Sequence, residues 1–137
     1  MLHKLLFVIL LLGSVAFSQT NIVDSTIAGN TYRGTLTAAT DTMDLKFSNT
    51  SAYSYHTVLV YCTAGADTVE VYVQVRDAGG EWSRISLVDK TSGSTVTSIA
   101  ASTTKKEFIL FDSYLQKVRY ISTSDDASTT VVVTSIK

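Results

Sequence analysis

The segment that decides the fold of this chain is VEVYVQVRDAGGEWSRISLV, residues 69–88. Its first half alternates between valine and a polar or aromatic residue, and a period of two is typical of a β-strand with one buried face. The turn sequence DAGG, residues 77–80, separates this half from a second apolar stripe that contains Ile85 and Leu87. The segment therefore predicts a β-hairpin whose valines face a core.

Matching the apolar faces of the two halves predicts the register of this hairpin. Val73 is expected opposite Ile85, which leaves aromatic and hydrogen-bonding side chains together on the other face. Such a face suits a sugar, because an aromatic ring covers the apolar C–H face of the sugar while polar groups bond its hydroxyls. The candidate ligand-binding residues are Tyr72, Gln74, Arg76, Trp82 and Arg84.

The same face also has a purely structural interpretation. The predicted register places Trp82 opposite Arg76, and the two side chains can stack as a cross-strand cation–π pair. Such a pair would cap the hairpin or lie under a neighbouring loop without binding any ligand.

The rest of the chain predicts an all-β fold of about eight strands, because Thr, Ser, Val, Ile and Tyr are abundant and long segments with helical periodicity are missing. Short strands with regular turn signals predict an antiparallel two-sheet β-sandwich of jelly-roll type, with a closed barrel as the alternative. Segment 57–63 is apolar on both alternating faces, which predicts a central strand covered on two sides. The remaining expected strands are residues 32–38, 43–47, 69–75, 82–88, 106–111, 117–123 and 129–136, with a short one at 96–99.

Residues 1–18 predict a secretory signal peptide. Lys4 precedes the apolar run 5–12, and small residues follow at Ala16 and Ser18. The run is too short to span a membrane, so no stable membrane span is expected after removal of the signal. The expected location is therefore secreted, extracellular or periplasmic.

The exported part divides into an arm and one domain. Residues 19–30 form an N-terminal arm that is either an ordered edge or a flexible lead-in, and residues 31–137 have the length of a single β-sandwich domain. The formal net charge of -1 gives no field that would attract nucleic acid, so no nucleic-acid partner is expected. Cys62 is the sole cysteine and is expected to be a small buried side chain, with an intermolecular disulfide as the alternative.

No catalytic constellation is visible, so we expect a protein that is not an enzyme and that needs no cofactor. His56, the sole histidine after residue 18, is expected at the surface rather than paired with Cys62 as a nucleophile. Asp125 and Asp126 are weak candidates for a metal site, because they lack the spacing of a calcium-binding loop. An enzyme whose carboxylates come from distant loops stays open, since spacing along the chain does not exclude it.

The segment 69–88, followed by KKEFILFDSYLQKVRYISTSDDASTTVVVTSIK at 105–137, resembles small jelly-roll modules of the discoidin or galactose-binding-like type and virion-associated β-sandwich proteins. The resemblance covers residues 57–137 and rests on the glycine-rich turn with Trp82 and on a closing hairpin that contains Arg119. It implies a role in attachment or structure. A signal peptide departs from what a phage particle assembled in the cytoplasm would use.

Two functions are therefore expected. The first is an exported, non-catalytic structural or interaction module that self-assembles through edge strands or associates with a surface, and the lack of proline removes one device that protects such edges. The alternative is a carbohydrate-binding module that uses the exposed face of the 69–88 hairpin to bind a surface glycan.

Overall fold

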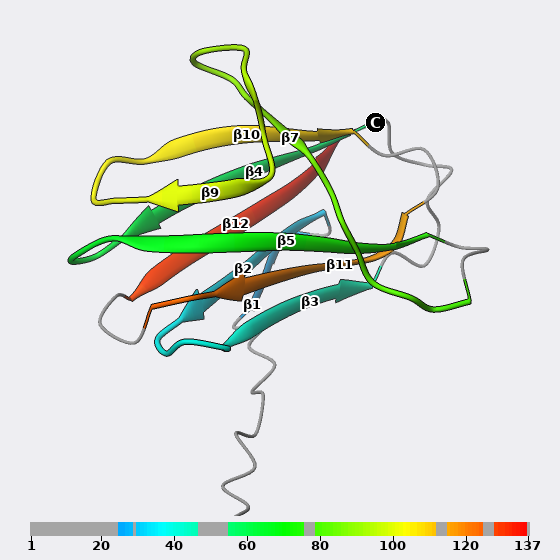
Figure 1. The fold of residues 1–137 in the computed structure, drawn as a ribbon, viewed down its shortest axis with the longest axis horizontal. Coiled ribbons are helices and arrows are strands. Elements are labelled where there is room, and N and C mark those ends of the chain that lie inside the picture. Colours follow the sequence, from blue (N-terminus) through cyan, green and yellow to red (C-terminus); the bar gives the residue numbers. More distant parts are fainter. Residues whose placement is uncertain are drawn as a thin grey trace, which may run out of the picture.

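The computed structural model describes residues 25–28, 30–46, 55–75, 79–111, 115–124 and 128–136. Their twelve strands form two antiparallel sheets, and the strands of one sheet cross those of the other at an angle (Figure 1). The buried apolar side chains of both sheets form one core. The predicted all-β sandwich is thus confirmed.

One layer of the sandwich is a seven-stranded sheet. β12 and β4 lie near its middle and pair along eight residues each. At one edge, β1 pairs with β2, so this part of the predicted N-terminal arm is an ordered edge strand. In spatial order the strands are β1 (Ser25–Ala28), β2 (Thr31–Leu36), β12 (Thr129–Ile136), β4 (Tyr55–Cys62), β10 (Lys106–Phe111), β7 (Leu87–Asp89) and β8 (Thr95–Val96).

The other layer is a five-stranded sheet in which β5 is the longest strand. β5 pairs with β11 on one side and with β6 and β9 on the other. The strands are β3 (Thr42–Lys46), β11 (Leu115–Ser122), β5 (Asp67–Val75), β6 (Ser83–Arg84) and β9 (Ser98–Ala101).

Most connections of the chain cross from one sheet to the other. β11 belongs to the five-stranded sheet and β12 to the seven-stranded sheet, so the expected closing hairpin of these two strands is wrong. The expected short strand at 96–99 is likewise divided into β8 and β9, which lie in different sheets. β9, β11 and β12 pair with strands remote in the sequence, whereas β8 pairs with the nearby β7, and the apolar pattern of one strand does not identify these partners.

Segment 69–88 has the predicted buried and exposed faces but not the predicted register. Val69, Val71 and Val73 are buried, as expected. Val73 pairs with Ser83, whereas the predicted partner was two residues further along. Because the period of a strand is two, a shift by two residues keeps every side chain on its face. The expected strand at 82–88 divides into β6 and β7, and its second half joins the other sheet.

β4 is a central strand, as predicted, but only one of its faces is fully buried. Val58 and Val60 face the core, whereas Leu59 and Tyr61 on the opposite face are half-buried. Lys105 covers part of this outer face, with its Nζ 5.2 Å from the centre of the Tyr61 ring. The prediction that both faces are covered is therefore wrong.

His56 faces the same core, so the expectation that it lies at the surface is wrong. It shares the inward parity of Val58 and is fully buried. Its Nδ1 lies 2.8 Å from Oγ of Ser135, directly opposite on β12. Cys62 is buried, as expected, and six strand residues separate it from His56, or about 20 Å at about 3.3 Å per residue. The two side chains therefore do not form a catalytic pair.

A buried carboxylate links the two sheets at one end of the sandwich. Asp67 Oδ2 accepts hydrogen bonds from Ser122 Oγ and Thr129 Oγ1, both at 2.8 Å, and Oδ1 accepts one from the backbone N–H of Thr123 at 3.2 Å. Asp67 and Ser122 belong to the five-stranded sheet and Thr129 to the seven-stranded sheet. The carboxylate therefore ties the two layers together.

Candidate functional site

The outward side of the five-stranded sheet carries most of the candidate residues. The registers align Asp44, Arg119, Tyr72 and Arg84 in one row across β3, β11, β5 and β6. All four side chains point away from the core, because the residues beside them on β3, β11 and β5 are buried and Ile85, next to Arg84, packs against the core. We call this surface the charged face; it consists of Asp44, Lys46, Glu70, Tyr72, Trp82, Arg84, Lys117 and Arg119.

The row begins with a bidentate ion pair. Arg119 donates from Nε to Asp44 Oδ1 at 2.7 Å and from Nη2 to Asp44 Oδ2 at 2.6 Å. The hydrogen bonds to Asp44 raise the pKa of Arg119 above its ordinary value, although partial burial opposes this. Both side chains are only about a fifth exposed, so the fork geometry holds the guanidinium plane in place.

Trp82 packs on this guanidinium. The Cζ of Arg119 lies 4.3 Å from the centre of the Trp82 ring, a cation–π contact. The ring is half-buried, so part of the indole stays accessible. The expected cation–π interaction of Trp82 is present, but its partner is Arg119, and Arg76 lies outside the described residues.

A second cluster lies further along the row. Tyr72 Oη donates to Glu70 Oε2 at 2.8 Å, and Arg84 Nη2 donates to Glu70 Oε1. The Cζ of Arg84 also lies 5.6 Å from the centre of the Tyr72 ring. The hydrogen bond from Tyr72, and next the ion pair with Arg84, lower the pKa of Glu70, although desolvation opposes them. The charge of Arg84 is therefore balanced within the face.

Gln74 does not share the accessibility of its neighbours. It is 7% exposed, and its Nε2 donates to the backbone carbonyl of Gly80 in the turn that follows β5. The turn places Gly79 and Gly80 at φ of 66° and 84°, a backbone region that favours glycine. The amide of Gln74 thus holds the turn that positions Trp82.

Sequence reasoning considered Asp44, with Asp41, as a carboxylate that could help hold calcium, but it did not place Asp44, Arg119, Lys46 and Lys117 in this face. The alternation at 43–47 and 117–123 already placed these side chains outward. What it did not contain was the pairing of β3 and β11 beside β5, which brings them next to Trp82.

The other predicted features lie elsewhere. Asp125 and Asp126 lie outside the described residues, and the described part of the chain contains no group of three His, Cys, Asp or Glu side chains that could hold a metal ion.

A hollow of about 290 Å³ lies beside Asp67, the only carboxylate among its described lining residues. In the described ranges no helix is long and apolar enough to cross a membrane. The hollow is lined by Ala66, Asp67, Thr68, Ala100, Ala101, Thr123 and Ser124.

The fold is shared with two solved structures, one of a prophage-derived protein and one of an exported protein. The SPBc2 prophage-derived protein YomS superposes with a TM-score of 0.62 at 14% identity, over 82% of this chain and 100% of YomS. The PBSX exported protein XepA superposes with a TM-score of 0.60 at 15% identity, over 89% of this chain and 43% of XepA, so the chain spans less than half of that protein. No protein-family model and no curated protein matches the chain, so the discoidin-type resemblance gains no support. At these identities the likeness shows a shared fold alone.

Proposed function

We propose that this chain is an exported, non-catalytic interaction module that associates with a surface outside the cell through its charged face. The observation that carries the proposal is the row of ionic and aromatic side chains that crosses four strands. Arg119 and Arg84 are each held by an acid and lie against an aromatic ring, so little side-chain entropy is lost when a partner binds. The description of XepA as an exported protein and the signal-like residues 1–18 support export.

A cosedimentation experiment tests the proposal. The purified protein is mixed with the cell-surface fraction of the producing organism, and the bound fraction is measured for the wild type and for two double variants. Glu70→Gln with Arg84→Gln removes an ion pair from the charged face. Lys90→Gln with Glu107→Gln removes an ion pair from the opposite sheet and leaves the same net charge, which makes it the matched control.

The proposal expects the wild type and the control to bind and the Glu70/Arg84 variant to lose most of its binding. Equal binding of both double variants, or no binding by the wild type, would overturn it. Circular dichroism and the thermal midpoint of each variant establish that the fold is kept.

Self-assembly is the other form that this interaction can take. In the described part of the chain, β3 is an edge strand of the five-stranded sheet and β8 is an edge strand of the seven-stranded sheet. An edge strand can pair with a strand of a second copy. Light scattering coupled to size exclusion at high protein concentration measures this, and a strict monomer contradicts assembly through edges.

Carbohydrate binding is the second candidate, favoured by the half-buried indole of Trp82 beside the Tyr72–Arg84 pair. A ring held from one side by Arg119 can offer accessible surface to the apolar face of a sugar. Trp82 is the sole tryptophan, so a glycan that binds there will shift its fluorescence. A broad glycan array without a hit, together with unchanged emission, removes this candidate.

A further inference from the structure

Two lysines stand side by side on the charged face. Lys46 on β3 is directly opposite Lys117 on β11, and both side chains point outward. In the part of the chain that the structure describes, neither lysine takes part in an ion pair. Like charges directly opposite each other on neighbouring strands repel, so this pairing of two lysines is unfavourable in the free protein.

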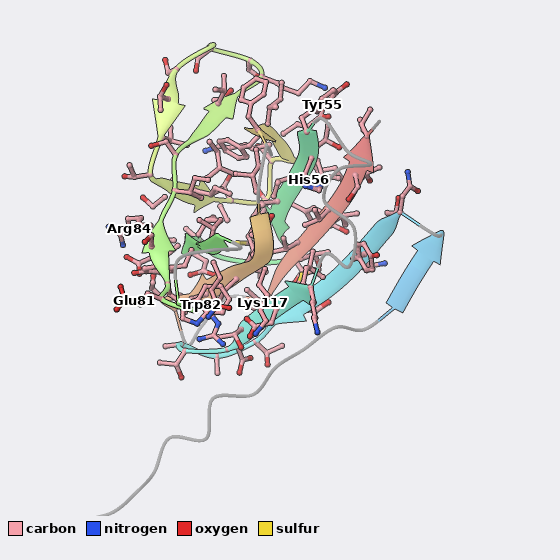
Figure 2. The ribbon with its side chains drawn as sticks, turned by 90° about the vertical axis from the view of Figure 1, so that its right-hand side faces the viewer. Tyr55, His56, Glu81, Trp82, Arg84 and Lys117 are labelled. Carbon is pink, nitrogen blue, oxygen red and sulfur yellow. The ribbon has the colours of Figure 1, made fainter. Side chains whose placement is uncertain are left out.

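The other cations of this face are already balanced. Arg119 is paired with Asp44, and Arg84 is paired with Glu70. The exposed Glu81 precedes Trp82, and Figure 2 shows it on the side of Trp82 away from Lys117. The positive charge without a described partner is therefore concentrated at the two lysines.

Trp82 lies at the same end of the face. Its ring packs on Arg119, which is two residues from Lys117 on β11 and shares its outward face. Lys117 pairs with Gln74, whose neighbour Val73 pairs with Ser83 next to Trp82, and in the view of Figure 2 Trp82 and Lys117 lie toward the same end of the molecule. A ligand that bridges the lysines can therefore also reach the indole.

We propose that Lys46, Lys117 and Trp82 bind an acidic polysaccharide, with its carboxylates at the lysines and a sugar ring against the indole. The inference rests on the proposed function, since it names the ligand class for the charged face. A carboxylate between the lysines replaces their repulsion by two attractions, whereas a neutral glycan leaves the repulsion in place. The formal net charge of -1 supplies no broad positive field for any polyanion, so the two lysines must attract the ligand locally, and the test separates an acidic polysaccharide from nucleic acid.

The test uses sodium polygalacturonate as the acidic polymer and dextran as the neutral one, with affinity measured by titration calorimetry and by Trp82 fluorescence. The wild type is expected to bind polygalacturonate more tightly than dextran, and more weakly at high salt because the lysines are screened. Replacing both Lys46 and Lys117 by glutamine is expected to weaken binding about tenfold, as for two surface charge contacts.

A second pair of lysines provides the control. Replacing Lys105 and Lys106 by glutamine removes the same charge at a place where the two side chains lie against Tyr61 and the carbonyl of Ala100. This control is expected to keep wild-type affinity, and Trp82→Leu to lose the tighter binding together with the fluorescence change.

Several results would overturn the inference. They are equal weakening in the two lysine double variants, no preference for polygalacturonate over dextran, or equally tight binding of a single-stranded DNA oligonucleotide. A neutral glycan that binds at Trp82 would contradict an acidic ligand but would still support carbohydrate binding as the function of this face. If the protein associates with the cell surface through Glu70 and Arg84 but binds no glycan, the acidic-polysaccharide inference fails and the proposed interaction module remains supported.

Discussion

Replacing Asp67 by alanine tests how the two layers are held together. The change removes three hydrogen bonds to a buried carboxylate that is 5% exposed. Bonds to a charged group contribute about 1.5–3 kcal/mol each, but the variant also avoids burying a charge. Ser122 Oγ keeps its 3.3 Å contact with the Ser124 carbonyl, and Thr129 Oγ1 its 3.3 Å contact with Cys62 Sγ.

The net loss of unfolding free energy is therefore about 3 kcal/mol, which lowers the thermal midpoint by about 12 °C in a domain of this size. Urea unfolding followed by Trp82 fluorescence and by circular dichroism measures it. Asp89→Ala is the matched control, because Asp89 Oδ1 accepts two backbone N–H bonds, at 2.7 and 3.1 Å, in an exposed turn. Water replaces these bonds, so the control is expected to lose less than about 1 kcal/mol.

An Asp67 variant whose unfolding free energy stays within about 0.5 kcal/mol of the wild type, or an Asp89 control that loses as much, would contradict this role of Asp67. Asp67→Asn is expected to lie between the wild type and the alanine variant, because the amide keeps one acceptor oxygen.

Three further predictions concern the core and the charged face. Tyr120→Phe is expected to raise the unfolding free energy by about 1 kcal/mol, because the hydroxyl is buried with no hydrogen-bond partner in the described structure; urea unfolding checks this, and a loss of stability contradicts it. Arg119→Ala is expected to lower the unfolding free energy by about 1–2 kcal/mol and to shift Trp82 emission to the red, since it removes the Asp44 pair and the cation–π contact; unchanged emission refutes the packing. Glu70 has a folded pKa below its ordinary value, so its stabilising contribution is full above about pH 4.3 and is lost as the pH falls through the folded pKa. Glu70→Gln is thus expected to reduce the acid-induced loss of stability between neutral and low pH, and an unchanged pH profile contradicts this.

The periodicity of the sequence predicted which side of each strand is buried, because inward and outward positions differ in polarity. It placed Val71 and Val73 inside and Tyr72 and Arg84 outside, as the structure has them. It did not distinguish two registers that differ by two residues, since both keep the same faces.

The periodicity did not predict which sheet each strand joins or which distant strand lies beside it. The alternation in β11 and β12 is compatible with a hairpin, yet each strand has its longest pairings in a different sheet. The contact between Trp82 and Arg119 depends on the placement of β11 beside β5, which no local signal contains. His56 is the second residue of β4. The apolar run that follows it did not show that the buried face of the strand already includes His56.

The most direct test of the central claim, that the charged face is the surface that binds, is a map of backbone amide shifts in the isotope-labelled protein on addition of solubilised cell-surface polysaccharide. Shifts are expected along β3, β11, β5 and β6, centred on Lys117 and Arg119, while the amide resonances of β4 and β10 stay unchanged. Shifts concentrated on β4 and β10, or none at a concentration at which the protein cosediments with the cell surface, would contradict it.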